Sequence, residues 1–292
     1  MKTEVLAGAD LRRAVEALKN GEPVIFPTET VYGLAAPIFH KEAVKKIFTI
    51  KGRPQDNPLI AHISSLEEAE GIGEISDAFL KLAEAFWPGP LSIVVRKKRA
   101  VPEIVSAGLP TIAIRMPSHP IARSLIEEVG VPLVAPSANL SGKPSPTCLA
   151  DCLEDLDGKV RLAVDGGECE VGIESTVIGL LPEPVYLRPG AITKEAIEKV
   201  LGQTVSDPLP NGPILSPGMK YRHYAPKAKV HLCFRKEEWR EPLIQPNAKT
   251  LYALLRDADR KNVSDIYVDC NEQIQKDAAI MNRLLRASGQ IH

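Results

Sequence analysis

Residues 51–63 read KGRPQDNPLIAHI, a turn with two cations that leads directly into an apolar stretch. One glycine, two prolines and an asparagine are typical of a stiff turn, and PLIAHI (58–63) is typical of a buried strand. Lys51 and Arg53 therefore lie at one end of a predicted sheet. Either they belong to a solvated turn, as most Lys and Arg do, or they bind an anion such as a triphosphate, with Arg53 bidentate and Lys51 as a point charge.

The composition is that of a globular protein with balanced charge. The chain has 292 residues, 44% of them hydrophobic, and a formal net charge of −1, which does not favour a protein spread along nucleic acid by bulk electrostatics. The charge is uneven, because residues 1–205 carry 22 Lys and Arg against 27 Asp and Glu, whereas residues 206–229 have a net charge of +3. A basic connector beside an acidic body can bind that body or an anion held in it.

The cysteines and the apolar runs indicate a cytoplasmic protein. None of the five cysteines forms a CxxC pair or a Cys/His cluster of zinc spacing, so we expect five reduced thiols. The N-terminus lacks the apolar core of a signal peptide. No apolar run reaches the ~18–20 residues that span a membrane.

Residues 1–202 alternate helical and strand patterns and predict one α/β domain with about nine strands. Several strands follow each other too closely for a crossover helix, which predicts a mixed sheet. Residues 203–229 are rich in Pro and predict a stiff linker, although they also contain two Tyr and one His. Residues 230–292 predict a small α/β domain. Its expected elements are strands at KVHLCF (229–234), TLYALL (250–255) and SDIYVDC (264–270) and a helix over 272–287.

Capping residues predict where two helices of the large domain begin. Asp10 precedes a helical pattern over residues 11–20 and is a typical N-cap. Ser65 and Glu68 have the spacing of a capping box for the short helix that starts directly after Ser65.

Four polar clusters border apolar strands, which is where α/β sheets bind ligands. In the third cluster, Ser145 and Pro146 predict the start of the helix TCLADCLEDL. Free amide groups at that helix end, with the hydroxyls nearby, would form a phosphate site, unless these serines only cap the helix. The clusters are PTET (27–30), KGRPQDN (51–57), PSANLSGKPSPT (136–147) and ESTV (174–177).

Arg115 ends the predicted strand TIAIR, on the same side as Thr111 and Ala113. An Arg on the buried side of a strand needs an anion, either a ligand carboxylate or an internal Asp or Glu. His62, within PLIAHI, is more typical of a satisfied core residue than of a catalyst.

Several familiar chemistries are excluded. Ser175 lies in no nucleophile elbow and has no His and Asp at recognisable spacing, and nothing near Cys169 indicates an activated thiol. Neither GxxxxGK[ST] nor GxGxxG is present, which argues against a P-loop or a dinucleotide fold.

Five segments in order, PTETVYGL, KGRPQDNPL, PSANLSGKPSPT, GIESTV and YLRPG, resemble the threonylcarbamoyl-AMP synthase family with its YrdC-like fold. The hallmark of that family, K-x-R followed far downstream by S-x-N, matches Lys51, Arg53, Ser137 and Asn139. SPGMKYRHYAP (216–226) resembles the linker of the long, two-domain form.

The resemblance implies three parts. They are a YrdC-like catalytic domain with a twisted mixed sheet (1–202), a linker that acts as a lid over the active site (203–229), and a small Rossmann-like domain (230–292). It also implies an ATP-dependent condensation in which L-threonine and bicarbonate form a carbamate that attacks the α-phosphate of ATP. Pyrophosphate leaves, and threonylcarbamoyl-AMP passes to the proteins that modify tRNA. Mg²⁺ is expected with the nucleotide, and the sequence names no ligands for it.

The site residues follow from the same resemblance. Lys51 and Arg53 are the implied catalytic cations, and Arg115 is the implied partner of the threonine carboxylate. The threonine site would consist of Thr30, His62, Arg115, the backbone of Ala135, and Ser175. The ATP site would consist of Lys51, Arg53, Asn57, Thr111, Ser137, Asn139, Ser145, Arg188 and Tyr224.

Two alternatives remain open. A carbamoyltransferase of related fold would use carbamoyl phosphate, but it normally carries zinc-finger and acylphosphatase-like modules that this sequence lacks. A non-catalytic RNA-binding translation factor would need a basic surface with interleaved aromatics, whereas residues 1–205 are net negative and aromatics make up 5% of the chain.

Overall fold

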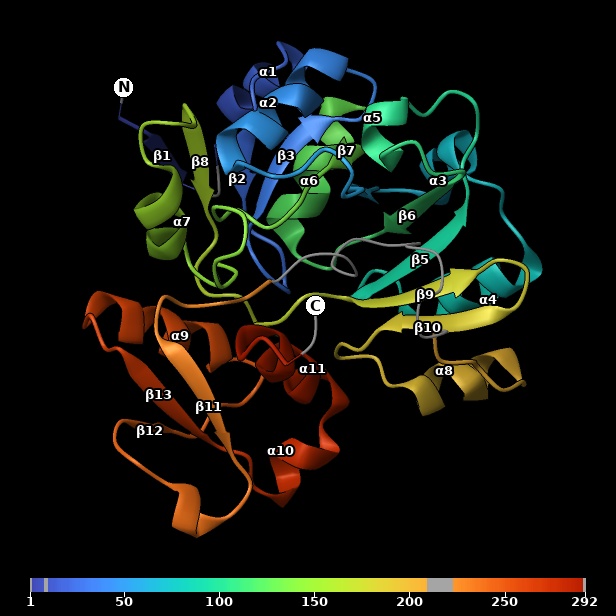
Figure 1. Cartoon of the computed structure of the whole chain (residues 1–292). Coiled ribbons are helices and arrows are strands. Elements are labelled where there is room, and N and C mark those ends of the chain that lie inside the picture. The colour runs from blue at the N-terminus through green and yellow to red at the C-terminus, as the bar shows by residue number, and fades with distance from the viewer. Residues whose placement is uncertain (1, 8–9, 209–222, 291–292) are drawn as a thin grey trace.

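The structure, a computed structural model, describes residues 2–7, 10–208 and 223–290 of the chain. Two α/β units follow each other in sequence and are stacked in space (Figure 1). The large unit contains a ten-stranded sheet and the small unit a three-stranded sheet. The predicted fold class is confirmed: a large mixed sheet with helices, followed by a small α/β domain.

The large sheet mixes parallel and antiparallel neighbours, as its short connections predict. Its strands are β1 (Glu4–Ala7), β2 (Val24–Phe26), β3 (Gly33–Pro37), β4 (Ile60–His62), β5 (Leu91–Arg96), β6 (Thr111–Arg115), β7 (Leu133–Val134), β8 (Leu162–Asp165), β9 (Thr176–Leu180) and β10 (Pro184–Arg188). Their order is β1-β8-β2-β3-β7-β4-β6-β5-β9-β10. At the centre, β4 runs parallel to β6 and antiparallel to β7. The sequence pattern indicates neither β1 nor β3, because β1 is short and β3 is rich in Gly and Ala.

Helices pack on both faces of this sheet. They are α1 (Arg12–Lys19), α2 (Lys41–Lys51), α3 (Leu66–Ile72), α4 (Asp77–Phe86), α5 (Glu103–Ser106), α6 (Pro120–Val129), α7 (Leu149–Leu156) and α8 (Lys194–Leu201). Val24 and Phe26 of β2 belong to a cluster with α1 and α6, whereas Ile25 belongs to a second cluster with α2 and α4. This alternation is expected for a strand whose two faces are both buried.

Local capping signals predict the helix starts only in part. The prediction that Asp10 caps α1 is wrong, because the capping position falls on Leu11, whose side chain cannot accept a hydrogen bond. The hydroxyl of Ser65 does accept from the Glu68 amide at 3.4 Å. In a capping box, the Glu68 carboxylate would accept from the amide of Ser65. Here it accepts instead from the amide and hydroxyl of the preceding residue, Ser64.

The small unit has a parallel sheet in the order β11-β13-β12. Its elements are β11 (Lys229–Cys233), the 3₁₀ turn η1 (Lys236–Glu238), β12 (Leu243–Ile244), α9 (Leu251–Arg260), β13 (Asp265–Asp269), α10 (Glu272–Lys276) and α11 (Ala278–Ala287). The predicted strand TLYALL is wrong, since Thr250 is the N-cap of α9 and the other five residues belong to that helix. The single helix predicted over 272–287 is also divided, because Asp277 ends α10 and its carboxylate caps α11.

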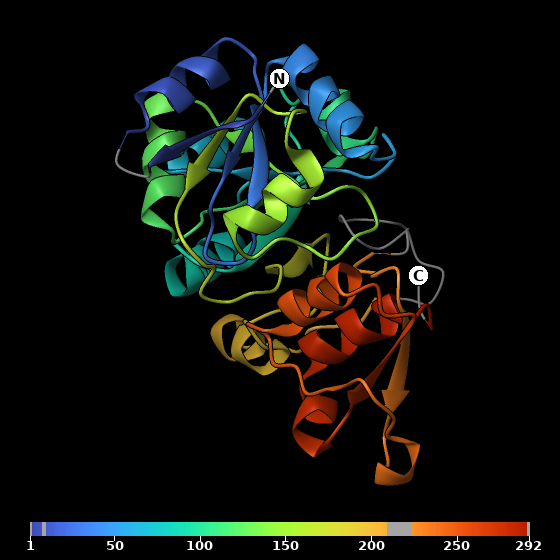
Figure 2. The same ribbon diagram turned by 90° about the vertical axis from the view of Figure 1, so that its left-hand side faces the viewer.

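The two units share one apolar cluster. Val31 and Ile173 of the large unit pack in the same cluster as Leu251, Leu255 and Leu284 of the small unit. Helices α9 and α11 lie on the side of the small unit that faces the large one (Figure 2). The small unit is therefore docked through a continuous core.

No helix among the described residues combines the length and apolarity that crossing a bilayer requires.

Candidate active site

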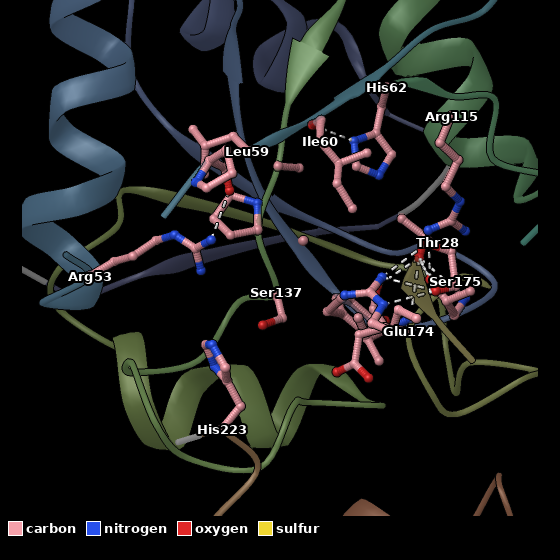
Figure 3. A pocket seen from close by; sticks show the side chains of 18 of the residues that line it. Thr28, Arg53, Leu59, Ile60, His62, Arg115, Ser137, Glu174, Ser175 and His223 are labelled. Carbon is pink, nitrogen blue, oxygen red and sulfur yellow. Dashed lines mark hydrogen bonds between the residues drawn. The ribbon is translucent and has the colours of Figure 1, made fainter. Parts of the chain in front are cut away.

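A cavity that is partly open to solvent lies where loops from several strands of the large sheet meet (Figure 3). All five residues predicted for the threonine site line it, which are Thr30, His62, Arg115, Ala135 and Ser175. Four of those predicted for the ATP site also line it, which are Arg53, Ser137, Arg188 and Tyr224. The structure therefore brings together residues that are far apart in the sequence.

Parallel pairing of β4 and β6 explains why His62 and Arg115 meet. Each is the last residue of its strand, and the two are register partners. The carboxyl ends of parallel neighbours lie at the same edge of a sheet, so both side chains reach the same cavity. Figure 3 shows His62 on one wall, with Arg115 close to Thr28 and Ser175.

Arg115 is buried and paired with an internal acid. Its Nη2 lies 2.6 Å from Oε1 of Glu29, and both side chains are 4% exposed. Its other nitrogens donate to the hydroxyl of Thr30 at 2.9 Å and the carbonyl of Gly89 at 3.3 Å. Burial alone would raise the pKa of Glu29, but the attraction of Arg115 outweighs it and holds that pKa below the ordinary value. Glu29 is thus the internal anionic partner of Arg115, and Arg115 also lines the cavity.

His62 is held in its neutral form. Burial, and then the charge of Arg115, lower its pKa to about 3. Its Nδ1 lies 3.2 Å from the carbonyl oxygen of Ile60, and its ring packs edge-on against Phe26. A neutral imidazole in this wall can make a hydrogen bond to a ligand without adding charge.

Lys51 lies behind the cavity wall. It is the last residue of α2, where Gly52 takes a left-handed φ of 61° and ends the helix. Its buried ammonium donates to the carbonyl oxygens of Ser137 and Asn139. Burial, and then the charge of Arg53, lower its pKa well below the ordinary value. Lys51 thus holds the S-x-N loop in place and is not among the residues that line the cavity.

Arg53 faces the cavity from the opposite side to Arg115 (Figure 3). Its guanidinium donates to the carbonyls of Pro58 at 2.9 Å and Asn57 at 3.3 Å, which fixes its direction. Next to it, the hydroxyl of Ser137 donates to the side-chain oxygen of Asn139 at 2.5 Å. The S-x-N loop therefore presents one hydroxyl to the cavity, with the Asn side chain as its support.

Ser145 does not begin a helix, so the predicted Ser-Pro cap is wrong. α7 begins later, after Cys148. The hydroxyl of Ser145 instead donates to Glu174 Oε1 at 2.5 Å. The helix-end phosphate site inferred from that cap loses its basis, because Ser145 is oriented by a carboxylate.

Arg188 and Ser175 are linked at the start of β9. The Nε and Nη2 atoms of Arg188 donate to the carbonyl of Ser175 at 3.1 and 2.9 Å, and Nη2 also lies 3.2 Å from its hydroxyl. The Ser175 hydroxyl is 2.8 Å from that of Ser92. Serine here is a hydrogen-bonding group among other polar groups, in keeping with the exclusion of a serine hydrolase.

The sequence did not indicate three residues that belong to one contact at the cavity wall, which are Glu174, Tyr252 and Arg283. Glu174 lines the cavity beside Ser175, and it binds Tyr252 and Arg283 of the small unit. A signal for Arg283 exists, because it lies at helical spacing with the apolar Ile280, Leu284 and other residues of the same helix. An Arg on the apolar side of a helix indicates a buried partner.

Five predicted residues lie outside the lining. They are Lys51, Asn57, Thr111, Asn139 and Ser145, and all are buried. Asn57 Nδ2 and Thr111 Oγ1 have no hydrogen-bond partner among the described residues.

No group of three or more His, Cys, Asp or Glu in the described ranges could hold a metal ion. All five cysteines are free thiols, as expected. Of the predicted lid, residues 203–229, the structure does not describe residues 209–222, and His223 and Tyr224 line the cavity.

Three arginines and several hydroxyls line the cavity, and family models match both the large unit and the small unit. A family model described as "Telomere recombination" (Sua5/YciO/YrdC) matches residues 16–190, and a second, "Threonylcarbamoyl-AMP synthase, C-terminal domain", matches 192–245 and 244–289. The chain belongs to the threonylcarbamoyl-AMP synthase family, in its two-domain form.

Particular relatives support this assignment over nearly the whole chain. The chain is 42% identical to the threonylcarbamoyl-AMP synthase of Pyrococcus abyssi, over 96% of this chain and 94% of that one. It is 41% identical to the synthase of Bacillus subtilis, over 96% and 93%. The crystal structure of P. abyssi Sua5 complexed with L-threonine superposes with a TM-score of 0.91 at 39% identity, covering 98% of each chain.

Proposed function

We propose that this protein is an L-threonylcarbamoyladenylate synthase, which makes threonylcarbamoyl-AMP and pyrophosphate from L-threonine, bicarbonate and ATP. The observation that carries the proposal is the single cavity with Arg115, Thr30 and His62 on one side and Arg53 and its neighbours on the other. The names of the relatives, and the threonine complex of the Pyrococcus protein, support the same substrates.

The chemistry balances without a nucleophile from the protein. The amine of threonine adds to the carbon of bicarbonate and water leaves, which gives a carbamate. A carbamate oxygen then attacks the α-phosphorus of ATP, a mixed anhydride with AMP forms, and pyrophosphate departs. The protein must therefore hold three reactants in line and neutralise charge. The absence of an activated Ser or Cys among the described cavity residues fits this requirement.

On the threonine side, Arg115 binds the carboxylate. Its pairing with Glu29 fixes the guanidinium before the ligand arrives, so little ordering is lost on binding. Thr30, neutral His62 and Ser175 offer hydrogen bonds around the amino acid, and the backbone of Ala135 closes this side.

On the nucleotide side, Arg53 binds the phosphates and balances the charge of the leaving pyrophosphate. Ser137, Arg188 and Tyr224 line the same cavity. Lys51 acts through the S-x-N loop that it holds. The remaining residues of the proposed ATP site act from just behind the lining, and they are Asn57, Thr111, Asn139 and Ser145.

Mg²⁺ would arrive bound to ATP. When bound, the ion would neutralise part of the charge of the triphosphate. Glu174 is the one carboxylate in the described lining, and Ser145, Tyr252 and Arg283 already engage it. The residues present therefore fit a nucleotide-borne ion better than a metal site built by the protein.

The division of labour along the chain is part of the proposal. Residues 1–202 would catalyse the reaction, residues 203–229 would close over the nucleotide and exclude water, and residues 230–292 would form the docked small domain. The reaction would occur in the cytoplasm, which agrees with five free thiols. The product would pass to the proteins that transfer the threonylcarbamoyl group to tRNA.

The test is pyrophosphate release from ATP with Mg²⁺ and bicarbonate, with and without L-threonine. The proposal expects release that depends on threonine and a product that contains both threonine and AMP. Release independent of threonine would contradict it. A salt-dependent RNA shift without threonine-dependent ATP consumption would instead favour the RNA-binding alternative.

A further inference from the structure

Arg283 of α11 is buried in the wall between the two units. Its side chain is 0% exposed, although it belongs to the small domain, which the proposed chemistry does not otherwise require. A buried guanidinium needs every donor satisfied. Outside its own helix, its hydrogen-bond partners among the described residues all belong to the large unit, and they are Glu174 and Pro189.

The central contact is with Glu174, which lines the proposed active site. Arg283 Nε donates to Glu174 Oε2 at 3.0 Å, and Nη2 donates to the Glu174 carbonyl at 3.2 Å. The hydroxyl of Tyr252, on α9, donates to the same Oε2 at 2.7 Å. Oε1 accepts from Ser145, so residues of both units fix the two oxygens of one carboxylate.

Tyr224 extends this network toward the cavity. The centroid of its ring lies 5.5 Å from the centroid of the Tyr252 ring. The Arg283 guanidinium lies 5.6 Å from the centroid of the Tyr224 ring. Tyr224 also lines the cavity. A change at Arg283 therefore reaches two residues of the wall.

The charge of Glu174 needs compensation at this place. A carboxylate in the wall of a pocket for a triphosphate repels its ligand, unless a nearby cation neutralises it. Arg188 shares that wall, but its guanidinium is directed to Ser175. Arg283 is the cation that contacts the Glu174 carboxylate directly.

Docking of the small unit has other ionic contacts. Arg256 of α9 pairs with Asp155 at 2.9 Å and donates to the carbonyl of Pro144 at 2.7 Å. Arg260 pairs with Asp151 and Glu154. None of these acids lines the cavity. The interface thus contains matched arginines that dock the domain without touching the active-site wall.

We propose that Arg283 is a positioning residue for ATP: from the small domain it neutralises and fixes Glu174, so that docking of this domain sets the affinity of the site for the nucleotide. The inference rests on the proposed function for the identity of the nucleotide. It assigns to the small domain a part in the active site that is exerted through Glu174.

The test compares ATP and L-threonine binding to five full-length proteins. They are the unsubstituted chain, Arg283→Met, Glu174→Gln, the double variant Glu174→Gln/Arg283→Met, and the control Arg260→Met, whose side chain is 41% exposed. Each is titrated by calorimetry with ATP and Mg²⁺ and, separately, with L-threonine. KM values for both substrates come from pyrophosphate release, and thermal unfolding reports on folding.

Arg283→Met is expected to weaken ATP binding by about tenfold or more, with a change of about threefold or less for threonine. The double variant is expected to regain most of the ATP affinity, because no uncompensated charge remains. Arg260→Met is expected to bind ATP like the unsubstituted protein. If Arg283→Met does not fold, the double variant compared with Glu174→Gln carries the test, and equal ATP affinities are expected.

Three results would overturn the inference. The first is an Arg283→Met variant that binds ATP as tightly as Arg260→Met does. The second is an equal loss of affinity for ATP and for L-threonine in Arg283→Met. The third is a double variant that binds ATP no more tightly than Arg283→Met does. The proposed function fails separately, if the unsubstituted protein binds ATP but releases no pyrophosphate with threonine. Absence of ATP binding by the unsubstituted protein would overturn both.

Discussion

Two parts of the cavity wall are built in different ways. The side with Arg115, Glu29 and His62 lies within the large unit and is held by adjacent strands and a buried ion pair. Beside Ser175, Glu174 receives hydrogen bonds from both units. The difference teaches that the proposed amino-acid site is complete in one domain, whereas part of the proposed nucleotide site depends on domain docking.

The largest effect that would test this contrast is expected at Arg115. Arg115→Ala should raise the KM for L-threonine about 100-fold and lower the free energy of unfolding by about 3–5 kcal/mol, because Glu29 stays buried without its partner. Pyrophosphate release and denaturant titration measure the two effects. The matched Glu29→Gln/Arg115→Met variant should recover stability but not threonine affinity. A rise mainly in the KM for ATP would show that the sides are assigned wrongly.

Arg53→Ala should slow AMP transfer about 10²-fold, because a cation facing the phosphates is lost. Single-turnover formation of threonylcarbamoyl-AMP measures this step, and threonine affinity should change little. Arg53→Lys keeps the charge without the planar fork and should recover part of the rate. Lost threonine affinity with a normal rate would reverse the roles given to Arg53 and Arg115.

The pH dependence of stability sharpens the picture of the threonine side. His62 has a folded pKa of about 3 against an ordinary value of 6.5. The unfolded chain therefore binds the proton first as the pH falls, and stability is lost between about pH 6.5 and pH 3, by at most about 1.4 kcal/mol per pH unit. Urea titrations at several pH values should show a shallower decline for His62→Asn. Parallel curves for the two proteins would mean that His62 is not buried in its neutral form.

The smallest effect is expected at Tyr252. Tyr252→Phe removes one hydrogen bond from Glu174 and leaves Arg283 in place, so the KM for ATP should rise about fivefold, equivalent to ~1 kcal/mol. The KM for threonine should not change. The matched control is Tyr267→Phe in the same domain, where the ring stacks on His231. Equal effects of the two substitutions would break the link between Glu174 and the nucleotide.

Much of the fold and site follows from local sequence. The mixed sheet follows from short connections, and the clusters after strands indicate the cavity. The prediction of a strand at TLYALL is wrong because six residues are too few to distinguish a helical from a strand periodicity. The apolar positions Leu251, Leu255 and Ala258 have helical spacing only over the longer segment.

Contacts distant in sequence account for what could not be predicted. Ser145 has the local signature of a helix cap, yet Glu174 orients its hydroxyl. Lys51 was expected to meet a phosphate, yet it holds the carbonyls of another loop. Arg283 meets Glu174 only because the domains dock. No local propensity encodes such partners.

The central claim is that one cavity holds an amino acid and a nucleotide close enough to react. Its most direct test is a crystal structure with L-threonine and a non-hydrolysable ATP analogue bound together. The account predicts the threonine carboxylate on Arg115, the phosphates on Arg53, and the threonine amine directed toward the α-phosphate with room for one carboxyl group between them. Ligands in separate places, or phosphates remote from Arg53, would contradict it.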